Sequence, residues 1–387
     1  MQTEQEPVIE KLAEQAVEIP EVTETKNPFD IITKNQRVFV LIPLGILAGL
    51  CFNWLHVPVG WLLGPMVLGL AYCLIKGNAQ PLPPNFMTVA KAFLGVATAV
   101  RCSPETLSLA TAYAIPLLVC VLITGSLSIF KGYLLSRWSN IDRTTSFLAS
   151  IPGAATGIIA MSEEMGADAV AVTVLQSLRL LLLVMLMPLA ANFLFPHDLA
   201  IQSTAIVATG NRPLMPIWLN LVILAVCCTL GNWIGNRFRL PSSGFLGSFV
   251  IGLVIAWVLP YRLAIPQWLF NAGLLLVGLC IGLRFDRQTA EKLLKVVLIE
   301  ICLVTVLILA CLGIGYEFHQ ITGVDTITAV LGFAPGMIEA MIATVMQLGG
   351  DPGLAMAMQM TRILLIIAIT PWLAKFLMKN AKSSETQ

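Results

Sequence analysis

Apolar and polar residues are arranged along this chain in long blocks. From Val38 to Met378 the sequence is a succession of apolar runs with short polar breaks, whereas Met1 to Arg37 is rich in Glu, Gln and Lys and has no helical apolar face. A helix of about 20 apolar residues is long enough to cross the hydrocarbon core of a bilayer. The pattern therefore predicts an all-α integral membrane protein with a polar N-terminal tail, and it argues against a soluble enzyme.

The apolar blocks form a repeat. Shifting the sequence by 183 residues aligns its two halves without a gap. Matches at Arg, Asp, Gln, Pro and Gly are much harder to obtain by accident than matches at Leu or Ala, so the halves are expected to be two copies of one unit. The matched pairs are Asn53/Asn236, Pro58/Pro241, Gly64/Gly247, Gly69/Gly252, Gly95/Gly278, Arg101/Arg284, Pro152/Pro335, Gly153/Gly336, Gly166/Gly349, Asp168/Asp351, Gln176/Gln359, Arg179/Arg362 and Pro188/Pro371.

Each unit contains six apolar segments, and these define the expected organisation of the chain. We expect a disordered cytosolic tail at 1–36, repeat 1 at 37–195, a polar loop at 196–215, repeat 2 at 216–379 and a cytosolic tail at 380–387. The segments are roughly 38–54, 59–76, 86–100, 109–134, 147–163 and 168–195 in repeat 1, and 216–235, 242–259, 268–283, 296–316, 327–346 and 352–378 in repeat 2.

The distribution of Lys and Arg favours one of two topologies. Six crossings per unit would give the repeats the same orientation, whereas five crossings would invert one relative to the other. If the fifth segment of each unit enters the membrane and returns, the loop and tail cations lie inside except for Arg101, Arg212 and Arg262. The positive-inside rule thus favours inverted repeats, with about ten transmembrane helices, two broken or re-entrant segments and both termini in the cytoplasm.

A Pro-Gly pair interrupts the fifth segment of each unit. Pro152-Gly153 lies in SIPGAATGIIAM, with Thr156 close behind, and Pro335-Gly336 lies in FAPGMIEAMI. Proline suits the first turn of a helix, and glycine permits unusual backbone geometry beside it. A helix that starts inside the membrane would offer free N–H groups to an anion. The alternative is a proline kink in an ordinary packed helix.

The sixth segment carries polar residues at the same spacing in both units. In each unit an Arg follows an Asp by eleven residues, which is about three helical turns and ~16 Å of helix. Each Arg is therefore expected on the same face of the helix as the Asp and near the bilayer midplane. An Arg at that depth costs at least ~2.5–3.5 kcal/mol. Either the Arg and Gln bind a carboxylate-bearing substrate, or the Arg satisfies carbonyls freed at the Pro-Gly break or pairs with an acid. The residues are Asp168, Gln176 and Arg179, repeated as Asp351, Gln359 and Arg362.

Carboxylates near these segments are candidates for coupling to H⁺ or Na⁺, because burial favours a carboxyl group that exchanges protons. Glu339 lies within the second broken segment, where the first unit has Thr156, and this asymmetry points to a single specialised role. A solvated loop is the alternative for the acids before the sixth segment. Lys91 is expected to snorkel to the membrane interface. The acids at the two turns are Glu163, Glu164, Asp168 and Asp351.

Composition narrows the class of protein further. Charged residues make up only 12% of the chain, against roughly 25% in a soluble domain. The net charge of +1 says nothing about partners, but the lack of a basic block and of a basic recognition helix argues against nucleic acid. The nine cysteines lie in or beside apolar runs without a CxxC, and the three histidines are scattered. We therefore expect no metal site and no cofactor.

These motifs resemble a family of duplicated bacterial membrane proteins called AbrB. The resemblance implies a multi-pass protein of the bacterial plasma membrane. Members are labelled as regulators of gene expression, and some as ammonia monooxygenases, while the architecture is similar to that of inverted-repeat secondary transporters. The motifs are VPVGWLLGP at 57–65, PGAATG at 152–157, MGAD at 165–168 and Gln176/Arg179, with second copies LPSSGFLGS, APGMIEA, LGGD and Gln359/Arg362, within about 38–378.

The leading hypothesis is a secondary transporter that moves a small organic anion or amino-acid-like solute by alternating access, with H⁺ or Na⁺ as coupling ion. A membrane sensor that regulates gene expression indirectly, with the tail 1–36 as its signalling contact, is the alternative. A membrane-bound oxygenase comes third, since its metal ligands are missing from the sequence. The expected substrate site comprises Arg179, Gln176, Arg362, Gln359, Pro152, Gly153, Pro335, Gly336, Thr156 and Glu339.

Overall fold

The computed structural model describes residues 28–102, 112–139, 141–151, 162, 166–194, 216–238, 240, 242–259, 261 and 263–365, with side chains from Phe39 onward. Throughout these ranges the regular structure is helical, as the sequence predicts. The chain divides into two units, residues 1–40 and 41–387. The first unit contributes the described start of α2, and all packing below lies within the second.

The helices follow the predicted apolar segments. α2 begins at Pro28, so a helix occupies residues that we expected to belong to the tail 1–36; proline is a favoured first helical residue. The helices are α2 (Pro28–Trp54), α3 (Gly60–Lys76), α4 (Pro84–Val100), α6 (Ala114–Trp138), α7 (Arg143–Ser150), α9 (Ala169–Leu194), α10 (Ile217–Arg237), α11 (Ser243–Val258), α12 (Gln267–Gly282), α13 (Arg287–Lys292), α14 (Leu294–Thr322), α15 (Thr326–Phe333) and α16 (Ile338–Leu348), with a further helix over 352–365.

Four helices in the described part of the chain, α6, α9, α10 and α14, are long and apolar enough to cross a membrane. α3, α4, α11 and α12 have 16 or 17 residues each, which corresponds to about 25 Å at 1.5 Å per residue. Large apolar side chains such as Ile115, Trp218 and Leu309 are exposed on the long helices. Exposed apolar surface on this scale suits contact with lipid better than contact with water.

Helix starts recur at a spacing of 183 residues. α3 begins at Gly60 and α11 at Ser243. The preceding residues, Val59 and Ser242, both have left-handed backbone conformations, with φ of 56° and 50°. A positive φ is uncommon outside glycine and is especially rare for a β-branched residue such as valine. The same unusual turn therefore precedes the second helix of both halves.

Two glycine contacts are reciprocal between the halves. A Cβ at Gly95 of α4 would overlap the carbonyl oxygen of Phe245 in α11, and a Cβ at Gly278 of α12 would overlap that of Leu62 in α3. Each glycine lets two helix backbones touch, as small residues do in membrane helix pairs. Gly95 and Gly278 are 183 residues apart, as are Leu62 and Phe245. Each half therefore supplies one glycine and one facing carbonyl to these two contacts.

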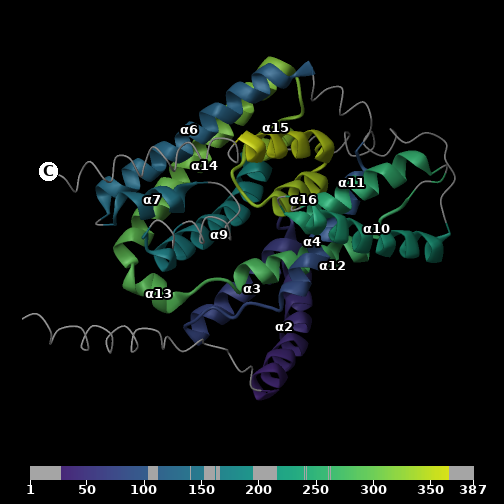
Figure 1. Cartoon of the computed structure of the whole chain (residues 1–387), viewed down its shortest axis with the longest axis horizontal. Helices are drawn as coiled ribbons and strands as arrows, with labels where there is room; N and C mark the ends of the chain where they lie inside the picture. Colours follow the sequence, from purple (N-terminus) through teal and green to yellow (C-terminus); the bar gives the residue numbers. More distant parts are fainter. Residues whose placement is uncertain are drawn as a thin grey trace, which may run out of the picture. The chain divides into compact units, whose positions relative to one another are not determined.

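The helices of the second unit form two bundles, each with contributions from both halves of the sequence. The first bundle consists of α3, α4, α10, α11 and α12, which pack chiefly on one another. The second bundle consists of α6, α7, α9, α13, α14, α15 and α16 (Figure 1). The bundles meet where α16 packs on α4 and α12 and where α9 packs on α12. The first bundle thus holds the second and third segments of both halves together with α10, and the second bundle holds helices from the later segments of both halves.

α15 and α16 form a hairpin whose two ends meet. Asp325 caps α15 by accepting a hydrogen bond from the backbone N of Thr328 at 3.0 Å. The backbone N of Asp351, just after α16, donates to the hydroxyl of the same Thr328 at 2.7 Å. The C-terminal end of α16 therefore lies beside the N-terminal end of α15, and the segment folds back on itself instead of continuing as one straight helix. The break lies at Pro335-Gly336, as the sequence predicts.

Candidate functional site

Arg362 is bound to the backbone at the break in the hairpin. Its Nη1 donates to the carbonyl oxygen of Ala334 at 2.5 Å, and its Nη2 donates to Oε1 of Gln359 at 2.6 Å. Gln359 Nε2 donates in turn to the carbonyls of Leu331 and Ala334, at 3.0 and 3.1 Å. These carbonyls lie at the C-terminal end of α15, where helical partners are missing. Arg362 and Gln359 thus supply the donors that the break requires.

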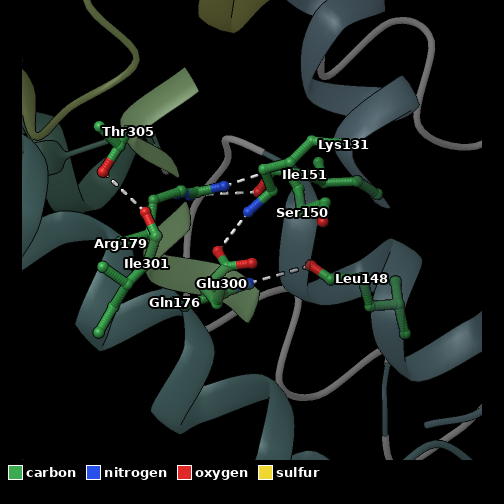
Figure 2. Close-up of polar contacts among 9 residues, drawn as sticks. All are labelled: Lys131, Leu148, Ser150, Ile151, Gln176, Arg179, Glu300, Ile301 and Thr305. Atoms are coloured by element: carbon green, nitrogen blue, oxygen red, sulfur yellow. Dashed lines mark hydrogen bonds and ion pairs between the residues drawn. The ribbon is translucent and has the colours of Figure 1, made fainter. Parts of the chain in front are cut away.

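Arg179 occupies the equivalent position in the first half. Its Nη1 and Nη2 donate to the carbonyls of Ser150 and Ile151 at 2.9 and 3.4 Å, and Gln176 Nε2 donates to the carbonyl of Leu148 at 3.2 Å (Figure 2). These carbonyls end α7, which is the counterpart of α15. Pro152, Gly153 and Thr156, which we expected in the same site, lie outside the described residues.

These contacts can be compared with the two roles predicted for the arginines, which are substrate binding and a structural role at the Pro-Gly break. Both guanidinium groups satisfy carbonyls at helix ends, which is the structural alternative predicted from the sequence. Both residues are only 4% exposed, and within the described part of the chain the Nε of each is buried without a hydrogen-bond partner. Arg362 also lies close enough to Arg179 for their positive charges to interact. Each of these two buried cations therefore keeps one unused donor, its Nε–H.

Asp168 and Asp351 act as helix caps. Asp168 Oδ1 accepts from the backbone N atoms of Val170 and Ala171, both at 2.9 Å. Asp351 Oδ1 accepts from Gly353 and Leu354 at 2.8 and 3.2 Å. Acceptors in these positions satisfy the free N–H groups of a helix start. The expectation that these carboxylates couple an ion therefore competes with an observed structural role. Glu163 and Glu164 lie outside the described residues.

Glu339 lies in the first turn of α16 and is bonded to the first bundle. Its Oε1 forms an ion pair with Nζ of Lys91 in α4 at 3.1 Å and accepts a hydrogen bond from the hydroxyl of Ser242, which precedes α11. Lys91 Nζ also donates to Ser242 Oγ at 3.3 Å. Lys91, which we expected to reach the membrane interface, is 23% exposed, and its ammonium group is paired with a carboxylate that is 2% exposed.

A second buried ion pair joins Lys131 of α6 to Glu300 of α14 (Figure 2). The side chains are 3% and 0% exposed. Sequence reasoning missed this pair because neither residue recurs: the positions 183 residues away hold Ile314 and Leu117. One signal could have revealed the pair: a single Lys and a single Glu lie inside separate apolar runs, each about two turns from a helix end. A lone charge at such a position is energetically costly, so each residue needs a partner of opposite charge.

The described residues hold no group of three or more His, Cys, Asp or Glu side chains that could bind a metal ion. A cavity of about 320 Å³ lies between the N-terminal half of α9 and the turn from α12 to α13. It is lined by Thr173, Ser177, Arg284 and neighbouring residues, and by none of the arginine, glutamine or glutamate side chains above. The cavity is therefore separate from the polar groups at the C-terminal ends of α7 and α15.

Fold and site together define an all-helical protein with apolar helices of membrane-spanning length, whose buried polar side chains gather at helix breaks. The chain belongs to the AbrB family: the family model described as "Transition state regulatory protein AbrB" matches residues 61–378. The resemblance drawn from the sequence motifs is thus confirmed.

Two relatives are similar over most of their length. One, from Escherichia coli (strain K12), bears the name "Putative regulator AbrB" and is 27% identical over 339 residues, which are 87% of this chain and 95% of that protein. The other, from Bacillus subtilis (strain 168), is named "Uncharacterized protein YhjN" and is 24% identical over 351 residues, 85% of this chain and 90% of that protein. No solved structure matches the chain.

Proposed function

We propose that this protein is a secondary transporter of the bacterial plasma membrane, built from two inverted repeats, that moves a small carboxylate-bearing solute. The hairpin of α15 and α16 supports the topology. A segment that enters the membrane and returns leaves five crossings per unit, and an odd number inverts the second copy. The recurrence of helix starts and glycine contacts at a spacing of 183 residues supports the duplication.

The observation that carries the proposed function is the pair of buried guanidinium groups. Arg179 and Arg362 come from opposite halves, lie within reach of each other's charge, and each keep an unused Nε–H. Glu300 acts on Arg179 but is also paired with Lys131, so the two guanidinium groups keep an excess of positive charge that a bound anion would balance. A carboxylate is a planar acceptor that matches guanidinium donors. The site is therefore suited to the carboxylate of an organic anion or amino acid.

The division into two bundles supplies a route for alternating access. Arg179 and Arg362 belong to the second bundle, while α4 and α12 of the first bundle border the hairpin at α16. A shift of one bundle against the other would expose the hairpin breaks first to one side of the membrane and then to the other. Rigid-body movement of this kind around a fixed site is how inverted-repeat transporters work.

Reconstitution tests the proposal directly. The full-length protein in liposomes should exchange external labelled solute for internal unlabelled solute, with succinate, L-glutamate and L-alanine as probes. Arg179→Lys and Arg362→Lys keep the positive charge but lose the planar fork, so each should slow exchange about tenfold, or ~1.4 kcal/mol. Arg137→Lys, at an exposed position of α6, is the matched control.

The arginine assignment fails if a folded Arg179→Ala/Arg362→Ala double variant exchanges a probe at the wild-type rate. Thermal unfolding of each purified variant separates loss of transport from loss of fold, which matters because both arginines also satisfy backbone carbonyls. Exchange of no probe by the wild-type protein would refute transport of carboxylate solutes of this kind.

An indirect regulator of gene expression is the second candidate, favoured by the name of the Escherichia coli relative. The polar tail would be its signalling contact, and α2 begins at Pro28, so deletion of residues 2–27 removes the tail without cutting the helix. A changed transcript profile with normal solute exchange would favour the regulator. Loss of exchange in this deletion variant would instead assign the tail to transport. No catalytic step forms part of either proposal.

A further inference from the structure

Three charged side chains meet where α6, α9 and α14 pack together. Lys131 and Glu300 form a buried ion pair, and Arg179 lies near Glu300 at the C-terminal end of α7 (Figure 2). Each of the three is less than 5% exposed. This group, called the charge cluster below, holds two cations and one carboxylate.

Several polar atoms of the charge cluster have unused hydrogen-bonding capacity. Within the described part of the chain, Glu300 Oε2 and Arg179 Nε are buried without a partner, as are the hydroxyls of Ser146 and Ser150 on α7. A buried polar group without a partner costs about 1–3 kcal/mol. Such a group of unsatisfied atoms requires a partner that the described residues do not supply.

The neighbouring elements add no further charge that would balance the cluster. The charged groups that act on Lys131 are Glu300 from α14 and Arg179 from α9. On α7 the carbonyl of Ser150 accepts a hydrogen bond from Arg179, and the charged residue of that helix, Arg143, is exposed. With every group in its ordinary charge state, the three residues of the charge cluster carry a net charge of +1, and Arg362, whose charge acts on Arg179, adds a further positive charge beside them.

A net charge of +1 at this depth is unfavourable, because the desolvation of an uncompensated ion costs several kcal/mol. Loss of one proton makes the cluster neutral, with Arg179 and Glu300 as the remaining ions. A solute carboxylate bound at Arg179 has the opposite effect, since its negative charge stabilises the protonated cluster. Proton occupancy and anion occupancy therefore favour each other, which is reciprocal linkage between two ligands.

From this geometry we infer that Lys131 and Glu300 form the proton-binding site that couples transport to H⁺, with one proton moving in the same direction as each carboxylate solute. The inference rests on the proposed function and names its coupling ion. In the release step an N–H bond of the Lys131 ammonium breaks, the electron pair stays on Nζ and the proton passes to water. In the loading step Nζ takes a proton from water as the anion binds.

The charge cluster does not suit Na⁺. A sodium ion would add positive charge to a group that already carries one excess cation, and Glu300 is its only carboxylate among the described residues. The counterparts of Lys131 and Glu300 in the other half are Ile314 and Leu117, so Arg362 has no equivalent pair. The asymmetry gives one coupling proton in each transport cycle.

The test compares exchange with accumulation in the same proteoliposomes. Exchange of labelled succinate, L-glutamate or L-alanine at equal pH reports transport alone. An interior more alkaline by one pH unit, with the membrane potential held at zero, should drive wild-type protein to about tenfold accumulation of the exchanged probe, because one pH unit is worth ~1.4 kcal/mol per proton.

Three variants separate a coupling role from a structural one. Lys131→Met/Glu300→Gln removes the site, and Lys131→Arg keeps the ion pair but cannot release its proton. We expect both to exchange more slowly and to show an accumulation ratio of about one. Arg287→Met/Glu291→Gln removes an exposed ion pair on α13 and is the control, with full accumulation expected. Thermal unfolding shows which variants are folded.

Each outcome decides between the proposals. Exchange in the wild-type protein without any response to the pH difference would overturn proton coupling and leave the proposed transport intact. Tenfold accumulation in a folded Lys131→Arg variant would overturn the assignment of the proton to Lys131. Exchange of no probe would refute the proposed transport, and the coupling with it.

Discussion

Glu339 of α16 and Lys91 of α4 join the two bundles through an ion pair of 3.1 Å, although 248 residues separate them in the sequence. Neither position carries a charge in the other half, where Thr156 and Leu274 take their places. Because Glu339 starts the inner helix of the hairpin, the pair ties the broken segment to the first bundle. Movement of the bundles against each other requires that this contact change.

Removal of Lys91 should leave Glu339 buried and unpaired. We expect Lys91→Met to lower the free energy of unfolding by about 3 kcal/mol, the lower end for a broken buried pair, since Lys91 is partly exposed. Lys91→Met/Glu339→Gln should recover much of this loss. Glu291→Gln, in an exposed pair, should cost less than about 1 kcal/mol. A Lys91→Met variant as stable as wild type in chemical unfolding would contradict the pairing.

The glycine contacts predict unequal effects of one substitution at four helical positions. Gly95→Ala and Gly278→Ala should destabilise the protein by about 1–3 kcal/mol each, because the new methyl group meets a backbone carbonyl that cannot move aside easily. Gly125→Ala in α6 and Gly313→Ala in α14 face open space and should be neutral or stabilising. Thermal unfolding of the four purified variants gives the comparison, and equal effects at all four would refute the packing of α4 on α11.

The capping role of Asp351 can be separated from ion coupling by two substitutions. Asp351→Ala removes the acceptor and should cost about 1 kcal/mol, whereas Asp351→Asn keeps a good cap and should cost much less. Both variants are measured by chemical unfolding and by accumulation at a pH difference of one unit. Loss of accumulation in a stable Asp351→Asn variant would show that the carboxylate charge itself takes part in coupling.

The bonds of Arg362 predict a local effect at the hairpin. Arg362→Met leaves the carbonyl of Ala334 with Gln359 as its side-chain donor and removes the Arg362 donor from Oε1 of Gln359, at a cost of about 1–3 kcal/mol for an unsatisfied group. Amide hydrogen exchange at residues 331–337 should therefore accelerate more than exchange in α14. Uniform protection across both regions would mean that Arg362 does not hold the break.

The sequence by itself determined the helices and the residues at their breaks. Apolar run length gave the helical class and most helix positions, and the 183-residue repeat paired the arginines and glutamines that the structure places on equivalent carbonyls. These features depend on contacts within one segment or between adjacent segments, so local spacing encodes them. The Pro-Gly break at 335–336 was predicted for the same reason.

Only the tertiary structure decided which distant side chains meet. Lys131 and Glu300 lie 169 residues apart, and Lys91 and Glu339 lie further apart still; neither pair recurs in the repeat, so no spacing rule connects them. Their contact depends on which helices pack together and on how each helix is rotated about its axis. The cost of a lone charge in an apolar interior then selects the pairing, and that cost is defined only once the surrounding helices are in place.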